Sequence, residues 1–172
     1  MSDSSQPLVG IVMGSESDWP RIAAAAQALK EFDVPFEVQV MSAHRTPELV
    51  REYALGAADR GLKVILAAAG GAAHLAGVIA AHTVLPVIGI PVPTELQGGL
   101  DSLLSTVQMP GDVPVAVVAV GGGGPRNAGL LAVQILALAS PPLQSRYAAF
   151  KRQLVEKVRA KNAALQATLQ RG

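Results

Sequence analysis

Short runs of consecutive apolar residues alternate along this chain with longer stretches in which apolar residues recur every three or four positions. The apolar runs predict β-strands at residues 8–13, 36–41, 62–68, 86–90 and 114–120. The periodic stretches predict helices at residues 19–32, 47–60, 73–84 and 127–139. This alternation is typical of crossover units, in which parallel strands form a sheet with helices on both faces. We therefore predict a three-layer αβα domain with a doubly wound parallel sheet.

Two further patterns predict contacts between subunits. Residues 127–139 are apolar on every side, and a helix without a polar face must be covered all round. A neighbouring subunit is the cover we expect, and a central position within its own chain is the alternative. Residues 143–169 follow the break at residues 141–142 and form a basic amphipathic helix, which we expect to pack across a subunit boundary. A helix on a membrane surface is the weaker interpretation, because Ala, Gln and Asn dilute the apolar face.

These patterns divide the chain into a predicted disordered tail (residues 1–7), a main domain (residues 8–140) and a C-terminal amphipathic helix (residues 141–172). A single domain is the simplest organisation for 172 residues. Half of the residues are hydrophobic and only 16% are charged, with a mean hydropathy of +0.36. Such an apolar composition favours surface buried between subunits.

Charge and residue usage exclude several classes of function. A net charge of +1 and an aromatic content of 3% provide neither a basic field nor stacking platforms, so we expect no nucleic-acid partner. The lack of cysteine excludes disulfides, thiolate metal sites and a cysteine nucleophile. The N-terminal residues lack the pattern of a signal peptide, and the apolar stretches are too short to span a bilayer. We expect a cytoplasmic protein without membrane association.

The first of three turns with candidate chemistry comprises residues 14–18 (GSESD). It links a strand to a helix, and the carboxyl ends of parallel strands meet at one edge of a sheet, where ligands bind. The glycine lets a ligand approach the backbone, and the helix start offers free N–H groups. Ser15 and Ser17 add hydroxyl donors, and Asp18 can accept from both hydroxyls of a ribose. The alternative is that Ser17 or Asp18 simply caps the helix.

The second turn comprises residues 42–47 (SAHRTP) and places a titratable group beside a fixed cation. Arg45 can form a bidentate pair with phosphate. Histidine is the side chain that ordinarily exchanges protons near neutral pH, so His44 can carry a proton in either direction. In the alternative, His44 bonds a backbone carbonyl and Arg45 pairs with Glu48. Because this turn shares its edge with the serine-rich turn, we favour a site for a phosphorylated substrate.

The third turn comprises residues 69–75 (AGGAAHL) and again opens a helix. Its small residues leave room for a flat ligand or a small carboxylate against the backbone. His74 either faces this site or caps the turn, and the pattern does not separate the two. His82 lies inside an apolar helix and is expected to be structural. His74 and His82 are too far apart along the helix to bind one metal, and His44 has no obvious partner ligand, so we expect no metal site.

No pattern for a common cofactor is found. Residues 121–124 are four glycines after the fifth predicted strand, but they do not match a dinucleotide fingerprint, and the first turn lacks G-x-G-x-x-G. Few aromatic residues are available to flank a flavin. The chain also lacks G-x-x-x-x-G-K-[ST], so ATP hydrolysis has no support. We expect chemistry without a cofactor.

Taken together, these motifs closely resemble the class I PurE family, the N5-carboxyaminoimidazole ribonucleotide mutases of purine biosynthesis. The matching segments are residues 12–19, 42–47, 69–75, 101–105, 107–110, 127–128 and 130–132. They occur in order between about residue 8 and residue 139, and several motifs together make the resemblance very specific. It implies a flavodoxin-like αβα domain that assembles as a homo-octamer and needs no metal or organic cofactor.

The resemblance also implies a reaction and roles for the residues of the three turns. The substrate would be a ribonucleotide whose carboxylate moves from the exocyclic nitrogen to ring carbon C4. His44 would be the general acid/base, giving a proton during decarboxylation and accepting one after trapped carbon dioxide is recaptured. Asp18 would hold the ribose. The phosphate would be held by Ser15, Ser42 and Arg45, with Ser17 nearby, and the base and carboxylate would be enclosed by Gly70, Gly71, Ala72, His74 and Leu75.

Three loops depart from the family pattern. They are residues 94–98 (TELQG), residues 111–112 (GD) and residues 124–126 (GPR), and they bear on loop closure and on packing near the base. Two alternatives remain open at this point. One is a carboxylase that takes free carbon dioxide and aminoimidazole ribonucleotide directly, and the other is a non-catalytic nucleotide-binding module on the same fold.

Overall fold

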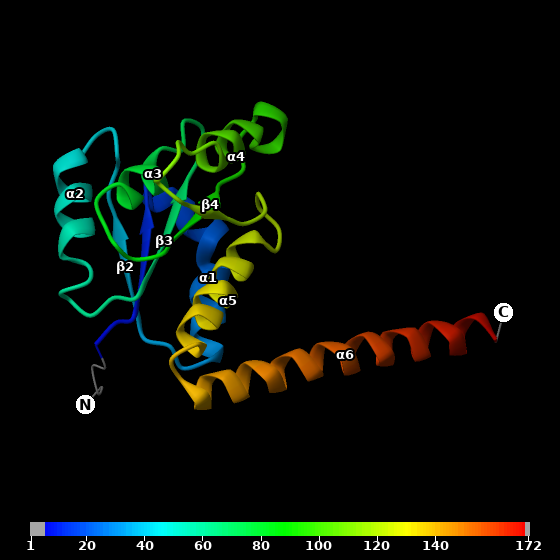
Figure 1. Ribbon diagram of the computed structural model, residues 1–172. Coiled ribbons are helices and arrows are strands. Elements are labelled where there is room, and N and C mark those ends of the chain that lie inside the picture. Colours follow the sequence, from blue (N-terminus) through cyan, green and yellow to red (C-terminus); the bar gives the residue numbers. More distant parts are fainter. Residues whose placement is uncertain (1–5, 171–172) are drawn as a thin grey trace.

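The computed structural model describes residues 6–170 and is built around a five-stranded sheet in the order β2-β1-β3-β4-β5 (Figure 1). The strands are β1 (Val9–Met13), β2 (Phe36–Val40), β3 (Val64–Ala69), β4 (Val87–Pro91) and β5 (Ala116–Val117). Each strand pairs in parallel with its neighbours. The predicted αβα domain is confirmed. Of the predicted N-terminal tail, residues 1–5 lie outside the described residues.

Helices cover both faces of the sheet. They are η1 (Glu16–Asp18), α1 (Trp19–Glu31), α2 (Pro47–Gly56), α3 (Leu75–Ala80), η2 (Leu96–Gly98), α4 (Leu100–Val107), α5 (Gly124–Ala137) and α6 (Pro141–Leu169). α1 and α5 pack on one face, and α2 and α3 pack on the other. α4 lies on the same side as α3, since its Thr106 occupies the space above Gly89 of β4.

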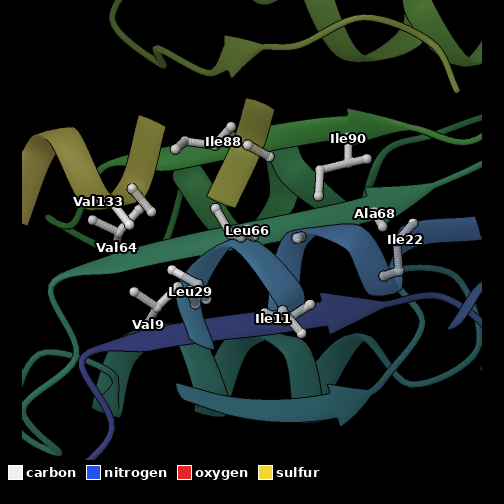
Figure 2. Close-up of a cluster of buried hydrophobic side chains, with 14 of the residues drawn as sticks. Val9, Ile11, Ile22, Leu29, Val64, Leu66, Ala68, Ile88, Ile90 and Val133 are labelled. Carbon is white, nitrogen blue, oxygen red and sulfur yellow. The ribbon is translucent and has the colours of Figure 1, made fainter. Parts of the chain in front are cut away.

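The core between the sheet and the α1–α5 layer consists of alternate strand residues, among them Ile11 and Leu66 (Figure 2). α5 approaches α1 very closely at Gly129, where an added Cβ would lie 2.5 Å from the carbonyl oxygen of Ala25. The apolar helix predicted in this region is therefore covered along much of its length by its own chain. Leu138, just after it, is 86% exposed. Cover by a neighbouring subunit remains a prediction.

The predicted helix 73–84 is too long. α3 is shorter at its start because residues 73 and 74 bond back to the carbonyls of the Gly71-Ala72 turn. At the other end, the hydroxyl of Thr83 accepts the N–H of Leu85, which stabilises a turn in place of a further helical turn.

The predicted strand 114–120 is also too long. β5 is an edge strand that pairs only with Ile88 and Gly89 of β4. The chain then turns through Gly121, at φ +57°, into α5, which begins at Gly124 and not at residue 127. α4 was not predicted, because this eight-residue helix buries polar residues and leaves leucines partly exposed.

α6 begins at Pro141, so the two prolines expected before the helix form its first turn instead. Its first turns pack on the end of α1, where Phe32 stacks on Tyr147 with ring centroids 5.6 Å apart. Arg146 pairs with Asp33 at 2.8 Å. From residue 151 to residue 169 the helix is exposed and extends away from the domain (Figure 1). Within residues 6–170, no helix combines the length and the hydropathy needed to cross a membrane.

Candidate active site

A cleft of about 400 Å³ opens at the carboxyl ends of β1, β2, β3 and β4. All three predicted turns border it, together with residues 92–94 after β4. This is the position at which ligands bind in doubly wound sheets, where the strand order reverses beside β1. Of the predicted site residues, the structure places in its lining Ser15, Asp18, Ser42, His44, Arg45, Gly70, Ala72, His74 and Leu75. Ser17 and Gly71 belong to the same turns but are not among the lining residues.

The first turn is held by hydrogen bonds among its own side chains. The Ser15 Oγ accepts the N–H of Ser17 at 3.3 Å and lies 2.9 Å from the Ser17 hydroxyl. Ser15 therefore caps η1, and neither Ser17 nor Asp18 provides the side-chain cap that was considered as the alternative. Burial raises the pKa of the Asp18 carboxyl above its usual value, while Arg21 opposes this shift and Glu16 adds to it. The Asp18 oxygens are left to accept from a ligand.

The second turn is closed by hydroxyl groups. The Ser42 Oγ accepts the N–H groups of His44 at 3.3 Å and of Arg45 at 3.2 Å. The Thr46 hydroxyl accepts the Ser42 N–H at 2.9 Å and donates to the Ser42 carbonyl at 3.1 Å. These bonds fix the direction in which both side chains leave the backbone. Thr46 was not predicted to contribute, although it stands in the motif.

Arg45 reaches across to the first turn. Its Nη2 donates to the Gly14 carbonyl at 2.7 Å. Among the described residues it forms no salt bridge, so the alternative pairing with Glu48 is not found. The guanidinium therefore lies between two turns, with its remaining N–H groups available to an anion.

His44 and His74 face each other. The His44 Nε2 lies 2.8 Å from the His74 Nδ1, and the two rings meet edge to face at 80°. One ring must donate its N–H and the other must accept, and the tautomers of the two rings decide which is the donor. His74 makes no side-chain cap to α3, so its orientation toward the cleft is the correct alternative. His82 donates from Nδ1 to the Val78 carbonyl at 2.8 Å and is structural, as predicted.

The third turn is fastened to α4 by a group of residues for which no role was predicted. The fully buried Ser102 accepts the Gly71 N–H at 2.9 Å and donates to the Val92 carbonyl at 2.7 Å. Asp101 accepts from Thr94 at 2.6 Å, and this bond lowers the pKa of the Asp101 carboxyl. The signal available in the sequence was a pair of small hydroxyl residues at helical spacing, positions 102 and 106, within an apolar stretch.

Arg21 is a second cation that was missed. It borders the cleft beside Asp18, and its Nη1 donates to the Pro93 carbonyl at 3.2 Å. Its position three residues after Asp18 could have indicated that both side chains share one face of the helix start.

The fold and the cleft define a flavodoxin-like α/β protein with a pair of histidines and an arginine in one cleft at the carboxyl edge of the sheet. A family model described as AIR carboxylase matches residues 8–157, and the chain belongs to this family. It is 62% identical over 161 residues to the N5-carboxyaminoimidazole ribonucleotide mutase of Mycobacterium tuberculosis H37Rv, covering 94% of this chain and 91% of that protein. The mutase of the same name from Bacillus subtilis is 60% identical over 131 residues, covering 76% of this chain and 81% of that protein.

Solved structures agree with these relatives. Treponema denticola PurE superposes with a TM-score of 0.80 at 29% identity, covering 92% of this chain and 98% of that chain. The predicted resemblance to the PurE family is confirmed.

Proposed function

We propose that this protein moves the carboxylate of N5-carboxyaminoimidazole ribonucleotide to C4, giving 4-carboxy-5-aminoimidazole ribonucleotide in purine biosynthesis. Relatives with this activity in their names include a protein that is 62% identical to the chain. The structural observation that carries the proposal is the His44 imidazole in the same cleft as Arg45 and the Gly70-Gly71 turn. A proton carrier, an anion-binding group and a small-residue pocket are what this reaction requires.

We assign His44 as the group that moves protons. In the first half of the reaction, the bond between the exocyclic nitrogen and the carboxyl carbon breaks. Carbon dioxide leaves, and the nitrogen takes a proton from the His44 imidazolium. In the second half, C4 bonds to the carbon dioxide and its hydrogen passes to neutral His44, which restores the starting state. His74 lies 2.8 Å from His44, so it can fix the orientation and the tautomer of that ring.

We assign the remaining lining residues to binding. Arg45, Ser15 and Ser42 are positioned for the phosphate, with Ser17 supporting Ser15. The Asp18 carboxylate accepts from the ribose hydroxyls, and Arg21 is a further cation on that side. The base and the migrating carboxyl group lie against the third turn, at Gly70, Gly71, Ala72, His74 and Leu75.

Substrate choice tests the proposal. The protein is mixed separately with N5-carboxyaminoimidazole ribonucleotide and with aminoimidazole ribonucleotide plus high bicarbonate, and the imidazole ultraviolet band is followed. Conversion of the N-carboxy compound is expected. The second candidate is the direct carboxylase, which the description of the matching family model favours. If the protein converts aminoimidazole ribonucleotide with bicarbonate but does not convert the N-carboxy compound, it is the carboxylase instead.

We further propose a cytoplasmic homo-oligomer, an octamer by the family resemblance. Several apolar side chains of α4 and α6 are exposed in the single chain, among them Leu104 at 47% and Val158 at 67%. Assembly would remove this surface from water. Light scattering at micromolar concentration should report a mass about eight times 17.7 kDa. A stable monomer would contradict the assembly.

A further inference from the structure

α4 buries polar side chains and exposes apolar ones, the opposite of a typical surface helix. Its buried positions are Ser102 and Thr106, at 0% and 3% exposure, while Leu104 and Val107 are about half exposed. Burying a hydroxyl costs free energy unless it is hydrogen-bonded, so each buried hydroxyl must have a partner that justifies its position. Thr106 donates only within its own helix, to the Ser102 carbonyl at 2.7 Å. Ser102 bonds to groups outside the helix.

The Ser102 hydroxyl joins two segments of the cleft. Its one proton points to the Val92 carbonyl at 2.7 Å, and its oxygen accepts the Gly71 N–H at 2.9 Å. One turn further along α4, the Ser105 hydroxyl donates to the Asp101 carbonyl of its own helix at 2.6 Å and also lies 3.2 Å from the Gly71 carbonyl. Gly71 has φ +70°, a backbone conformation that only glycine adopts readily. α4 therefore accepts the N–H of Gly71 through Ser102 and lies close to the Gly71 carbonyl through Ser105.

The same helix start also holds the loop after β4. Asp101 accepts from the Thr94 hydroxyl at 2.6 Å and from the Ser102 N–H at 2.8 Å. An added Cβ at Gly70 would lie 3.4 Å from the Thr94 methyl group. Two walls of the cleft are thus fixed to each other through the first turn of α4.

We propose that Ser102 is a positioning residue that holds the Gly70-Gly71 turn in place, so that the cleft retains carbon dioxide between its release and its recapture. This inference rests on the proposed mutase function. Carbon dioxide has no net charge, so it forms no ion pair with Arg45 that could retain it. Its retention depends on the shape of the small-residue wall, and that shape depends on the Gly71 hydrogen bond.

The test compares Ser102→Ala with Thr106→Val. Both changes remove one buried hydroxyl from the same helix, but only Ser102→Ala removes a bond to the cleft. Each variant receives N5-carboxyaminoimidazole ribonucleotide, and the ratio of released aminoimidazole ribonucleotide to C4-carboxylated product is measured. For Ser102→Ala we expect this ratio to rise and kcat to fall by about tenfold to a hundredfold, with a smaller change in KM. For Thr106→Val we expect a wild-type ratio with a lower melting temperature.

Hydrogen exchange at the Gly71 amide provides an independent reading. It should accelerate in Ser102→Ala and stay protected in Thr106→Val. If Ser102→Ala keeps the wild-type ratio while its melting temperature falls as in Thr106→Val, the role of Ser102 is only structural and the proposal is wrong. If wild-type protein does not convert the N-carboxy substrate at all, the mutase function fails, a result that is separate from any difference between the variants.

Discussion

The α1–α5 layer and the cleft at the edge of the sheet belong to one domain but are held together by different kinds of residues and contacts. In the layer, small apolar residues allow two helix backbones to touch, as at Gly129 and Ala25. At the cleft, hydroxyl, imidazole and guanidinium groups bond to backbone atoms of neighbouring turns, as Arg45 does to Gly14. The layer stabilises the fold through buried apolar area. The hydrogen bonds at the cleft fix the orientation of the side chains that face a ligand.

This difference predicts how each region responds to change. A side chain in the layer has no contact with a ligand, so its replacement should alter the free energy of unfolding and leave the reaction of the folded protein intact. The polar side chains at the cleft are partly exposed and carry little packing, so their replacement should alter turnover or binding at nearly constant stability.

His44→Asn should show the largest difference between its effect on turnover and its effect on stability. The loss of the proton carrier is expected to lower kcat by about 10²- to 10⁴-fold while substrate binding and melting temperature stay close to wild type. Steady-state kinetics, calorimetric binding and thermal unfolding measure the three quantities. If the protein were a non-catalytic nucleotide-binding module, the wild-type protein would bind the ribonucleotide without turnover, and this variant would change only binding or nothing.

Gly129→Ala is the counterpart in the layer. The new Cβ would lie 2.5 Å from the Ala25 carbonyl oxygen, so α1 and α5 must separate. We expect a loss of about 1–3 kcal/mol in the free energy of unfolding, measured by denaturant titration. Gly123→Ala is the matched control, because a Cβ there meets no atom within 4 Å. If Gly129→Ala lowered kcat per folded molecule, the claim that the layer affects stability and not the reaction would be wrong.

Arg45→Ala should weaken binding of the ribonucleotide by about tenfold to a hundredfold, the value of one or two charge-assisted hydrogen bonds. Calorimetry with the nucleotide and with its dephosphorylated nucleoside checks the cause. The variant should bind the two ligands alike. Arg51→Ala, on α2 and outside the cleft lining, is the control. Equal affinity of the wild-type protein for both ligands would exclude a phosphate role for Arg45.

The smallest effect is expected at the ion pair between Glu31 and Arg126, 2.8 Å apart at the end of the α1–α5 layer. The bond from Arg126 lowers the pKa of Glu31. The ion pair therefore stabilises the folded protein at pH values above the ordinary pKa of a glutamate carboxyl. This stabilisation is lost as the pH falls through the lowered pKa of Glu31 in the folded protein. Because both side chains are more than a third exposed, Glu31→Gln should cost only about 0.5 kcal/mol at neutral pH. A double-mutant cycle with Arg126→Gln isolates the pair, and a coupling that persists in strong acid would contradict this account.

Much of the fold and part of the cleft could be predicted because they depend on local patterns. Buried parallel strands are continuous apolar runs, and the strand order places their carboxyl ends together. The three turns around His44, Asp18 and Gly70 were therefore found at one edge. The position of His82 followed from its apolar surroundings.

What escaped prediction depends on long-range contacts. The direction of His74 is decided by its 2.8 Å contact with His44, thirty residues away. The role of Ser102 follows from partners at Gly71 and Val92, and its helix escaped detection because the apolar positions face outward. The position of Arg21 at the cleft depends on its hydrogen bond to the Pro93 carbonyl, in the loop after β4. Spacing along the sequence can place such residues on one face of a helix, but it does not show which distant backbone groups they contact.

The exposed part of α6 has a consequence for how the protein tumbles in solution. The exposed residues 151–169 form a helix about 28 Å long at 1.5 Å per residue, whereas a domain of about 140 residues has a radius of gyration of only about 14 Å. A free protomer would be strongly elongated, and its amide relaxation rates would depend on the angle between each N–H vector and the long axis. An assembly that packs α6 against other subunits would remove most of that dependence. Rotational diffusion therefore reports on whether the helix is covered, without any label on the helix itself.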